Sequence, residues 1–518
     1  MEKVRTYRKY INKNTMALLI VLLFVISLIP VVYVGLFNYA TGDDYWYGVH
    51  TYRGWKEGGL FSALKGSFLT VADFYENWQG TWFTLFLFTL SPNHFWENGY
   101  IITVFLALIL LIGSYSYLAY FYLVKKMKFS KATTTIIVCI LLYLSIQYIP
   151  RTTSGIYWFN GIMHYSVPFF LGVISIIHSH KFIENKKKKD YIILFLAFLL
   201  LGGGSYLAPL AASLAVSLIL ISQIEIKELN LKDKKFEIKY DWRNLWILPA
   251  FAVEFIGIAI SFLAPGNSVR GGEEFGFSLK WALECIIYAI DRGIYLGEDY
   301  FIKNGVTTVS YVILSVIIWS EMWRIDYSKY KFKLPFLWVI YMNGIYWAIY
   351  TPEIYSRSDV SGGVPNTYFH VFLIITLINI IYVHGWLQRL YLRFWEKNNR
   401  DREKSLLYGE KYQRFVMIPI VIFCAVLFGI ISYSDDIKTT SNYCVEYIKS
   451  GRMERYKEVR EEQHRILSEV SDEEAVVPEM IVDYPLLNMY LKEDITEPRN
   501  MDRAKYYNKK SVKAIMVE

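Results

Sequence analysis

The stretch MALLIVLLFVISLIPVVYVGLFN, residues 16–38, decides the class of fold. It contains no charged side chain and is longer than the roughly 20 residues with which an α-helix crosses the hydrocarbon core of a bilayer. It lacks a small-residue cleavage site of the kind that ends a signal peptide. We therefore expect a retained membrane anchor, preceded by the basic residues Lys3, Arg5, Arg8, Lys9 and Lys13.

The rest of the chain is similarly apolar. Of its 518 residues, 54% are hydrophobic and 20% are charged, and the mean hydropathy is +0.26, whereas about a quarter of a soluble domain is charged. This composition excludes an ordinary soluble enzyme. The apolar runs predict an all-α, multi-pass membrane protein with about eleven crossings, near residues 16–38, 100–123, 132–149, 165–180, 190–203, 204–223, 244–264, 305–321, 334–350, 366–386 and 415–432.

Lys and Arg residues divide the loops into two groups. The Lys- and Arg-rich loops are residues 1–15, 124–131, 181–189, 224–243, 322–333 and 387–414, and the alternate loops are 39–99, 150–164, 265–304 and 351–365. Because basic residues accumulate in cytoplasmic loops, we expect a cytoplasmic N-terminus and an extracytoplasmic C-terminal tail. The net charge of +8 is then explained by the basic residues that keep these loops in the cytoplasm. We therefore expect a lipid bilayer as a partner and no nucleic acid.

This sidedness requires two apolar stretches, near residues 81–90 and 281–297, to lie in the membrane interface without crossing. Both are short or interrupted by charge. After residue 432 the composition becomes that of a soluble segment, so we expect a transmembrane domain at 1–432 and a small extracytoplasmic α/β segment at 433–518, helical over 441–468 and extended over 475–487. To the four cysteines we assign no disulfide and no metal site: Cys139, Cys285, Cys424 and Cys444.

The first external loop begins with two adjacent carboxyl groups, Asp43 and Asp44, flanked by aromatic residues. A partly buried carboxylate is suited to act as a general base toward a hydroxyl group. The pair could also hold a divalent cation such as Mg²⁺ or Mn²⁺. The alternative is a solvated turn with aromatic anchors at the membrane surface.

The second external loop combines Arg151 with Trp158, Asn160 and His164. Sugar rings pack on aromatic faces, and sugar hydroxyls need neutral donors and acceptors, so we expect these last three residues to bind a sugar or an acceptor. Aromatic belts at membrane surfaces have a similar composition.

The remaining external loops add two cations, Arg270 and Arg357. The planar guanidinium group matches the geometry of phosphate, so we expect Arg270, with Arg151 or Arg357, to bind a phosphate at the level of the lipid headgroups. Neighbouring Asn267 and Glu353 are expected to contact the sugar or acceptor.

One ionisable residue, Glu254, lies inside a predicted span. Ionisable groups at that depth are costly and usually functional. The alternative is a neutral side chain that is hydrogen-bonded to a Ser, Tyr or Asn such as Asn343.

Six short motifs together carry a resemblance to a known family: Asp43-Asp44-Tyr45, Tyr75 to Gly80, Tyr157 to Gly161, Tyr165 to Pro168, Ala264 to Asn267 with Arg270, and Asn500 to Tyr507. The chain resembles a widespread, poorly characterised bacterial family of polytopic membrane proteins, which is itself similar to the GT-C superfamily of membrane glycosyltransferases. The resemblance covers nearly the whole chain. Where such proteins often carry Gly-Arg, this chain has Gly80-Thr81, so a donor contact from that Arg is not expected.

The resemblance implies a helical bundle whose first external loop supplies a catalytic Asp, a position that Asp43 or Asp44 matches. It further implies a polyprenyl-phosphate sugar as donor and an extracytoplasmic cell-surface glycan or polymer as acceptor, with no cofactor certain. Two alternatives stay open. One is a transporter or flippase for a lipid-linked glycan, and the other is a glycan polymerase or ligase.

Overall fold

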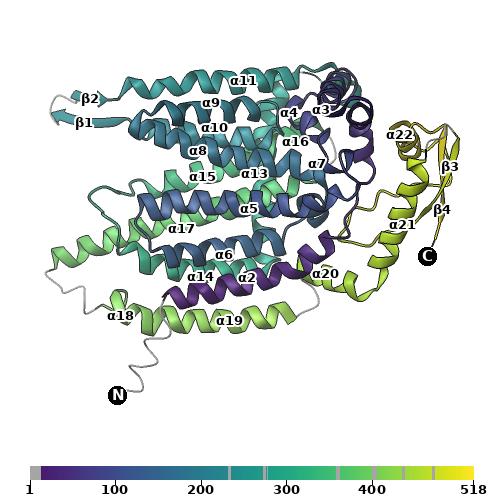
Figure 1. The fold of residues 1–518 in the computed structure, drawn as a ribbon. Helices are drawn as coiled ribbons and strands as arrows, with labels where there is room; N and C mark the ends of the chain where they lie inside the picture. The colour runs from purple at the N-terminus through teal and green to yellow at the C-terminus, as the bar shows by residue number, and fades with distance from the viewer. Residues whose placement is uncertain are drawn as a thin grey trace.

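The computed structural model describes residues 13–230, 235–271, 276, 278–357, 362–398, 405–433, 438–469 and 473–517. Nearly all of the regular structure in these residues is helical (Figure 1). The prediction of an all-α chain is confirmed in this general form. The basic residues Lys3, Arg5, Arg8 and Lys9, which entered the prediction of a cytoplasmic N-terminus, lie outside the described residues.

Seven helical segments in the described part of the chain are long and apolar enough to cross a membrane: Lys13–Gly35, Gly99–Lys126, Phe159–Asn185, Trp242–Phe262, Gly305–Met322, Val364–Lys397 and Gly409–Ile431. They contain the helices α2 (Lys13–Gly35), α5 (Ile102–Ala119), α8 (Val167–Asn185), α11 (Leu248–Phe262), α14 (Gly305–Met322), α17 (Val364–Lys397) and α19 (Ile418–Tyr433). The other four predicted spans coincide with helices of 14 to 17 residues: α6 (Lys131–Gln147), α9 (Lys188–Leu201), α10 (Leu207–Ile221) and α15 (Pro335–Ala348).

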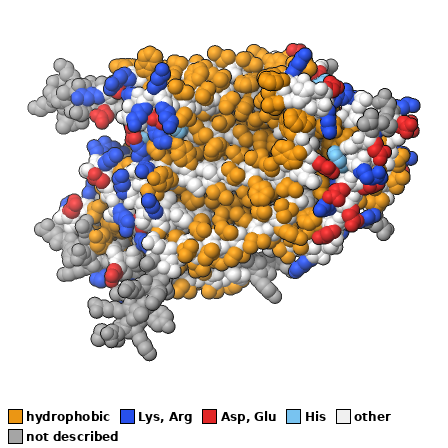
Figure 2. Space-filling model, viewed as in Figure 1, with side chains coloured by type: hydrophobic (Ala, Val, Ile, Leu, Met, Phe, Trp, Pro, Cys, Tyr) orange, Lys and Arg blue, Asp and Glu red, His pale blue; other side chains and the backbone are white. Residues whose placement is uncertain are grey.

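These helices lie side by side with their axes nearly parallel (Figure 1). Figure 2 shows hydrophobic side chains over the middle of the bundle and charged side chains at its two ends. Leu18 and Ile29 on α2 are each 60% exposed. Because so large an exposed apolar surface is unfavourable in water, this belt indicates a membrane protein.

The described residues of the two predicted groups of loops lie at opposite ends of the bundle (Figure 1). One end carries the antiparallel hairpin of β1 (Glu225–Asn230) and β2 (Lys235–Lys239), together with Lys-rich loops (Figures 1 and 2). The other end carries α3 (Asp43–Asn77), α4 (Trp82–Phe88), α16 (Thr351–Ser356) and the C-terminal segment. We call these the basic end and the loop end.

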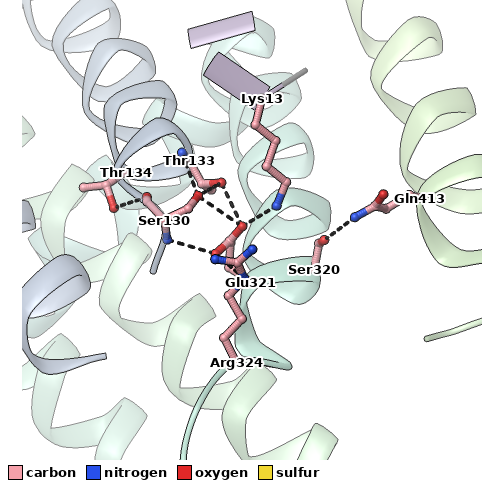
Figure 3. Close-up of polar contacts among 8 residues, drawn as sticks. All are labelled: Lys13, Ser130, Thr133, Thr134, Ser320, Glu321, Arg324 and Gln413. Atoms are coloured by element: carbon pink, nitrogen blue, oxygen red, sulfur yellow. Dashed lines mark hydrogen bonds and ion pairs between the residues drawn. The ribbon is translucent and has the colours of Figure 1, made fainter. Parts of the chain in front are cut away.

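A buried carboxyl group joins three helices at the basic end (Figure 3). Glu321 of α14 accepts hydrogen bonds from the Ser130 backbone N–H at 3.1 Å and the Thr133 hydroxyl at 2.9 Å, and it pairs with Lys13 of α2. A carboxylate is favourable beside the unpaired N–H groups that begin a helix such as α6. Glu321 therefore fastens α2 and α6 to α14.

At the loop end, α3 bends sharply at Gly58-Gly59, and Gly59 has a φ of +67°. Its two arms pack so closely that a Cβ on Gly66 would lie 2.2 Å from the His50 carbonyl oxygen. Glycine is needed at both places. The short helix α4 follows and covers the turn between α9 and α10, where the Phe83 N–H donates to the Gly203 carbonyl at 3.0 Å.

The two apolar stretches predicted not to cross are both helices outside the seven spanning segments. The first is α4, which has seven residues. The second is α13 (Leu279–Ile302), which carries charged residues along its length. Further short helical segments are η1 (Pro92–His94), η2 (Gly99–Ile101), η3 (Tyr120–Lys126), η4 (Thr153–Tyr157), α7 (Phe159–Gly161), η5 (Ile162–Ser166), η6 (Trp242–Ile247), α12 (Pro265–Gly271), α18 (Gly409–Tyr412) and η8 (Gln413–Met417).

The C-terminal segment consists of α20 (Thr440–Lys449), α21 (Arg452–Ser468), β3 (Glu474–Glu479), α22 (Pro498–Tyr507) and β4 (Ser511–Met516), with β3 and β4 parallel. It docks on α3 through aromatic contacts. Tyr506 stacks on Tyr52 with ring centroids 4.1 Å apart, and the Arg503 guanidinium lies 3.5 Å from the centre of the Tyr45 ring. These contacts hold α22 against the first turns of α3.

Candidate functional site

A cavity of about 1900 Å³ opens at the loop end and extends between α10 and α11. It also receives side chains from α3, α12, α16 and α22. Seven of the ten predicted site residues line it: Asp43, Trp158, Asn160, His164, Asn267, Arg270 and Glu353. Residues from distant parts of the sequence therefore line the same cavity.

The adjacent carboxyl groups Asp43 and Asp44 have different surroundings. Asp43 lines the cavity. Burial raises its pKa, while the nearby guanidinium groups of Arg499 and Arg270 act in the opposite direction. A carboxylate with a raised pKa is a stronger base than the carboxylate of an exposed Asp. Asp43 is therefore suited to accept a proton.

Asp44 is fully buried. Its Oδ2 accepts a hydrogen bond from the Thr41 backbone N–H at 3.0 Å and another from the Tyr100 hydroxyl at 2.7 Å. Burial raises its pKa to about 7. Successive residues of a helix point about 100° apart, so only one of the pair faces the cavity, and Asp44 instead holds the start of α3 in place.

Arg270 is positioned by two neighbours that also line the cavity. Its Nη1 donates a hydrogen bond to the Gln79 side-chain oxygen at 2.7 Å, and its guanidinium lies 5.2 Å from the centre of the Trp78 ring. Stacking on an aromatic face is a favourable arrangement for Arg. The guanidinium is thus held at the cavity, near enough for its charge to act against the rise in the pKa of Asp43.

The structure does not bring the other two predicted phosphate ligands to the cavity. Arg151 is exposed, and its backbone exchanges hydrogen bonds of 2.8 and 2.9 Å with the Asn366 side chain. Arg357 lies over the Trp281 ring at 4.6 Å. Neither residue is part of the cavity lining.

Sequence reasoning missed the groups that α22 supplies. Arg499 and Asp502 line the cavity from α22, which packs against α3. Burial raises the pKa of Asp502 to about 6, and the neighbouring charge of Asp43 acts in the same direction. The tail motif Asn500 to Tyr507 was the one signal that pointed to this helix, because it belongs to the stretch that carries the family resemblance.

A layer of neutral polar groups also lines the cavity. Asn160 is 1% exposed, and neither atom of its side-chain amide has a hydrogen-bond partner among the described residues. The same holds, within the described part of the chain, for Trp158 Nε1, Thr81 Oγ1 and Ser205 Oγ. Buried polar atoms are usually satisfied, so this layer is suited to a ligand with several hydroxyl groups.

The backbone around Asn160 is itself unusual. The short helix α7, which carries it, lies between two π-helical turns, η4 and η5. Single π-turns occur frequently at functional sites, because they re-aim side chains out of the regular helical pattern. His164 in the second of these turns is oriented by a 2.9 Å hydrogen bond between its Nδ1 and the Thr84 hydroxyl.

Two other predicted contacts already have partners in the protein. The Asn267 side chain accepts from the Gly80 N–H at 3.1 Å and donates to the carbonyl oxygens of Ser261 and Phe262. Asn267 therefore shapes the rim of the cavity by joining α12 to the loop after α3. The Glu353 carboxylate accepts a hydrogen bond from the Tyr368 hydroxyl, and burial raises its pKa.

Glu254 lines the deeper part of the cavity. Its hydrogen-bond partner is the Ser213 hydroxyl of α10. Ser is one of the three residue types expected as its partner, whereas Asn343 donates to the Val339 carbonyl oxygen at 2.8 Å. Hydropathy locates spans but not which of them are neighbours, so the type of partner was predictable and its position was not.

No group of three or more His, Cys, Asp or Glu side chains suited to a metal ion occurs in the ranges that the structure describes. The chain matches no protein-family model, and neither a curated protein nor a solved structure matches it. Function must therefore be inferred from the cavity and from the sequence.

Proposed function

We propose that this protein is a membrane glycosyltransferase, which moves a sugar from a polyprenyl-phosphate donor to a hydroxyl group of an extracytoplasmic cell-surface glycan or polymer. One observation carries the proposal. A single cavity holds a carboxyl group, Asp43, near two guanidinium groups, Arg270 and Arg499, and is also lined by neutral polar and apolar side chains. These are the groups that a lipid-linked sugar phosphate and its acceptor require.

Sidedness follows from the distribution of basic residues. In this proposal the basic end faces the cytoplasm, because Lys and Arg are retained on that side. The cavity then opens to the extracytoplasmic side, together with the C-terminal segment. In this proposal the four shorter helices at predicted spans, α6, α9, α10 and α15, also cross. The total is then eleven crossings, and an odd number places the two termini on opposite sides.

The donor is assigned to the cavity by its chemistry. Its phosphate lies at Arg270 and Arg499, since guanidinium groups bind phosphate oxygens in pairs of hydrogen bonds. Its sugar lies at Trp158 and Asn160. Its hydrocarbon chain leaves toward the bilayer past residues such as Phe255, whose side chain lines the cavity and is 72% exposed.

Transfer then requires a proton acceptor and a stabilised leaving group. The acceptor hydroxyl oxygen bonds to the anomeric carbon, and the bond between that carbon and the phosphate oxygen breaks. The electron pair of the broken bond leaves with polyprenyl phosphate. Asp43 accepts the hydroxyl proton, and the two guanidinium groups stabilise the charge that develops on the phosphate.

The resemblance to the GT-C superfamily supports the same proposal. It implies a catalytic Asp in the first external loop, and of the two candidates Asp43 is the one at the cavity. No nucleotide is needed, because the carrier phosphate is itself a good leaving group.

The test is release of polyprenyl phosphate from a panel of polyprenyl-phosphate sugars incubated with the purified protein and candidate acceptor glycans. We expect release with one donor, and a loss of about a hundredfold or more in the Asp43→Asn variant. Asp73→Asn is the matched control, because Asp73 is an exposed acid on the same helix. Equal release by Asp43→Asn and wild type would refute the role of Asp43. Lipid-linked glycan binding without release from any donor would favour transport or polymerisation.

A further inference from the structure

The deeper part of the cavity, which we call the intramembrane arm, has polar groups where a hydrocarbon chain would need none. Glu254 of α11 lies there with Ser213 and Ser217 of α10, among apolar side chains such as Phe251 and Ile258. Glu254 precedes the end of α11 by eight residues, which corresponds to about 12 Å of helix. These groups therefore lie deeper in the helical bundle than Arg270 and Asp43.

The carboxyl group of Glu254 is only partly satisfied by the protein. Its side chain is 1% exposed, and Oε2 accepts a hydrogen bond from the Ser213 hydroxyl. Its Oε1 has no hydrogen-bond partner within the described ranges, and no charged group there acts on this carboxyl group. An unpaired charge in such a place is very costly. The neutral acid is the form that fits, with its O–H on Oε1.

A neutral acid needs an acceptor for its O–H, because an unsatisfied buried donor is destabilising. A polyprenyl chain is a pure hydrocarbon and offers no acceptor. A glycerolipid does, because its ester carbonyl groups lie at the top of its acyl chains, a short distance below its headgroup. The Glu254 O–H in the arm is thus a group that the hydrocarbon chain of the polyprenyl-phosphate sugar cannot satisfy, whereas a glycerolipid can.

We propose that the intramembrane arm binds an ester-linked glycerolipid, one of whose ester carbonyl oxygens accepts a hydrogen bond from the Glu254 carboxyl group. The binding site stands on these contacts alone. Only the next step rests on the proposed function: the acceptor glycan is attached to the headgroup of this lipid and carries the acceptor hydroxyl. That oxygen bonds to the anomeric carbon, its proton passes to Asp43, and polyprenyl phosphate leaves with the electron pair.

The test compares two lipids that differ only at the ester. The full-length protein in detergent is titrated with dimyristoyl phosphatidylglycerol and with its ether-linked analogue, and bound lipid is measured by native mass spectrometry. We expect the ester lipid to bind about tenfold more tightly than the ether, the size of one hydrogen bond. The preference should persist in Glu254→Gln, whose amide can donate to the carbonyl, and disappear in Glu254→Leu.

Equal binding of the two lipids to the wild-type protein would overturn the inference, and so would an undiminished ester preference in Glu254→Leu. The wild-type comparison decides the question even if that variant does not fold. Polyprenyl phosphate is titrated in parallel and should bind wild type and Glu254→Leu equally, but Arg270→Ala more weakly. Sugar release without an ester preference would refute only the glycerolipid site. An ester preference without sugar release from any donor would refute only the glycosyltransferase.

Discussion

Replacing Asp44 by Asn should make the stability of the protein less dependent on pH. Asp44 is completely buried, and only its Oδ2 has partners, the Thr41 N–H and the Tyr100 hydroxyl. Oδ1 has none among the described residues. A neutral side chain fits this place better than a charged one, and Asn has the same shape without the ability to ionise.

The magnitude follows from the pKa of the group. Burial raises the pKa of Asp44 from 3.8 to about 7, and a difference of one in pKa corresponds to about 1.4 kcal/mol. Between pH 4 and pH 7 the folded protein keeps a proton that the unfolded chain has lost. Raising the pH through this window therefore favours unfolding, by up to about 4 kcal/mol in total.

The assay is the apparent melting temperature of the detergent-solubilised protein from pH 4 to pH 8. We expect wild type and Asp44→Asn to be similar at pH 4, and the variant to become progressively more stable than wild type up to about pH 7, with no further change above it. Other groups with raised pKa, such as Asp43 and Asp502, are present in both proteins and largely cancel in the difference. Asp73→Asn, at an exposed position, should show a constant difference.

A difference between wild type and Asp44→Asn that does not change with pH would refute the reasoning. So would a variant that loses stability relative to wild type as the pH rises. Either result would mean that Asp44 is ionised in the folded protein and that its charge is satisfied there.

Three further substitutions test the fold and the site. Glu321→Ala should lower the free energy of unfolding by about 3 kcal/mol, because Lys13 and the start of α6 lose their common partner; unchanged denaturant unfolding would contradict this. Arg499→Ala should raise the donor KM for polyprenyl phosphate release about tenfold, with partial recovery in Arg499→Lys; an unaltered KM would remove Arg499 from the phosphate site. Gly80→Ala would place a Cβ 1.8 Å from the Ser261 carbonyl oxygen, so we expect lower thermal stability and lower activity, and a wild-type melting curve would show that the loop can move aside.

Much of the architecture was predictable because each segment's own hydropathy and length decide whether it can cross the membrane. The stretch at 16–38 is helical and long enough to cross for reasons contained in its own residues, since the thickness of the hydrocarbon core sets the length of an apolar run. The same reasoning identified the apolar helices and separated α4 and α13 from them. It could not settle how many of the shorter helices cross, because α9 and α15 have only 14 residues each.

The composition of the cavity was only partly predictable. The aromatic and amide residues around Asn160 were recognised because aromatic rings and neutral donors and acceptors in one external loop are the groups that bind a sugar. Arg151 and Arg357 have the same chemistry as Arg270, and nothing local distinguishes them. Arg499 was missed because it follows the last span and reaches the cavity only through the docking of α22 on Tyr45 and Tyr52.

The sequence by itself thus determined that the chain is a helical membrane protein and which of its loops share an end, because hydropathy and charge act on each segment separately. The tertiary structure alone decided that Asp43 faces the cavity while Asp44 is buried, that Arg499 reaches the cavity, and that Glu254 accepts a hydrogen bond from Ser213. Those choices depend on the direction of single side chains and on contacts between segments far apart in the sequence. No local pattern encodes either, because both arise only when the helices pack.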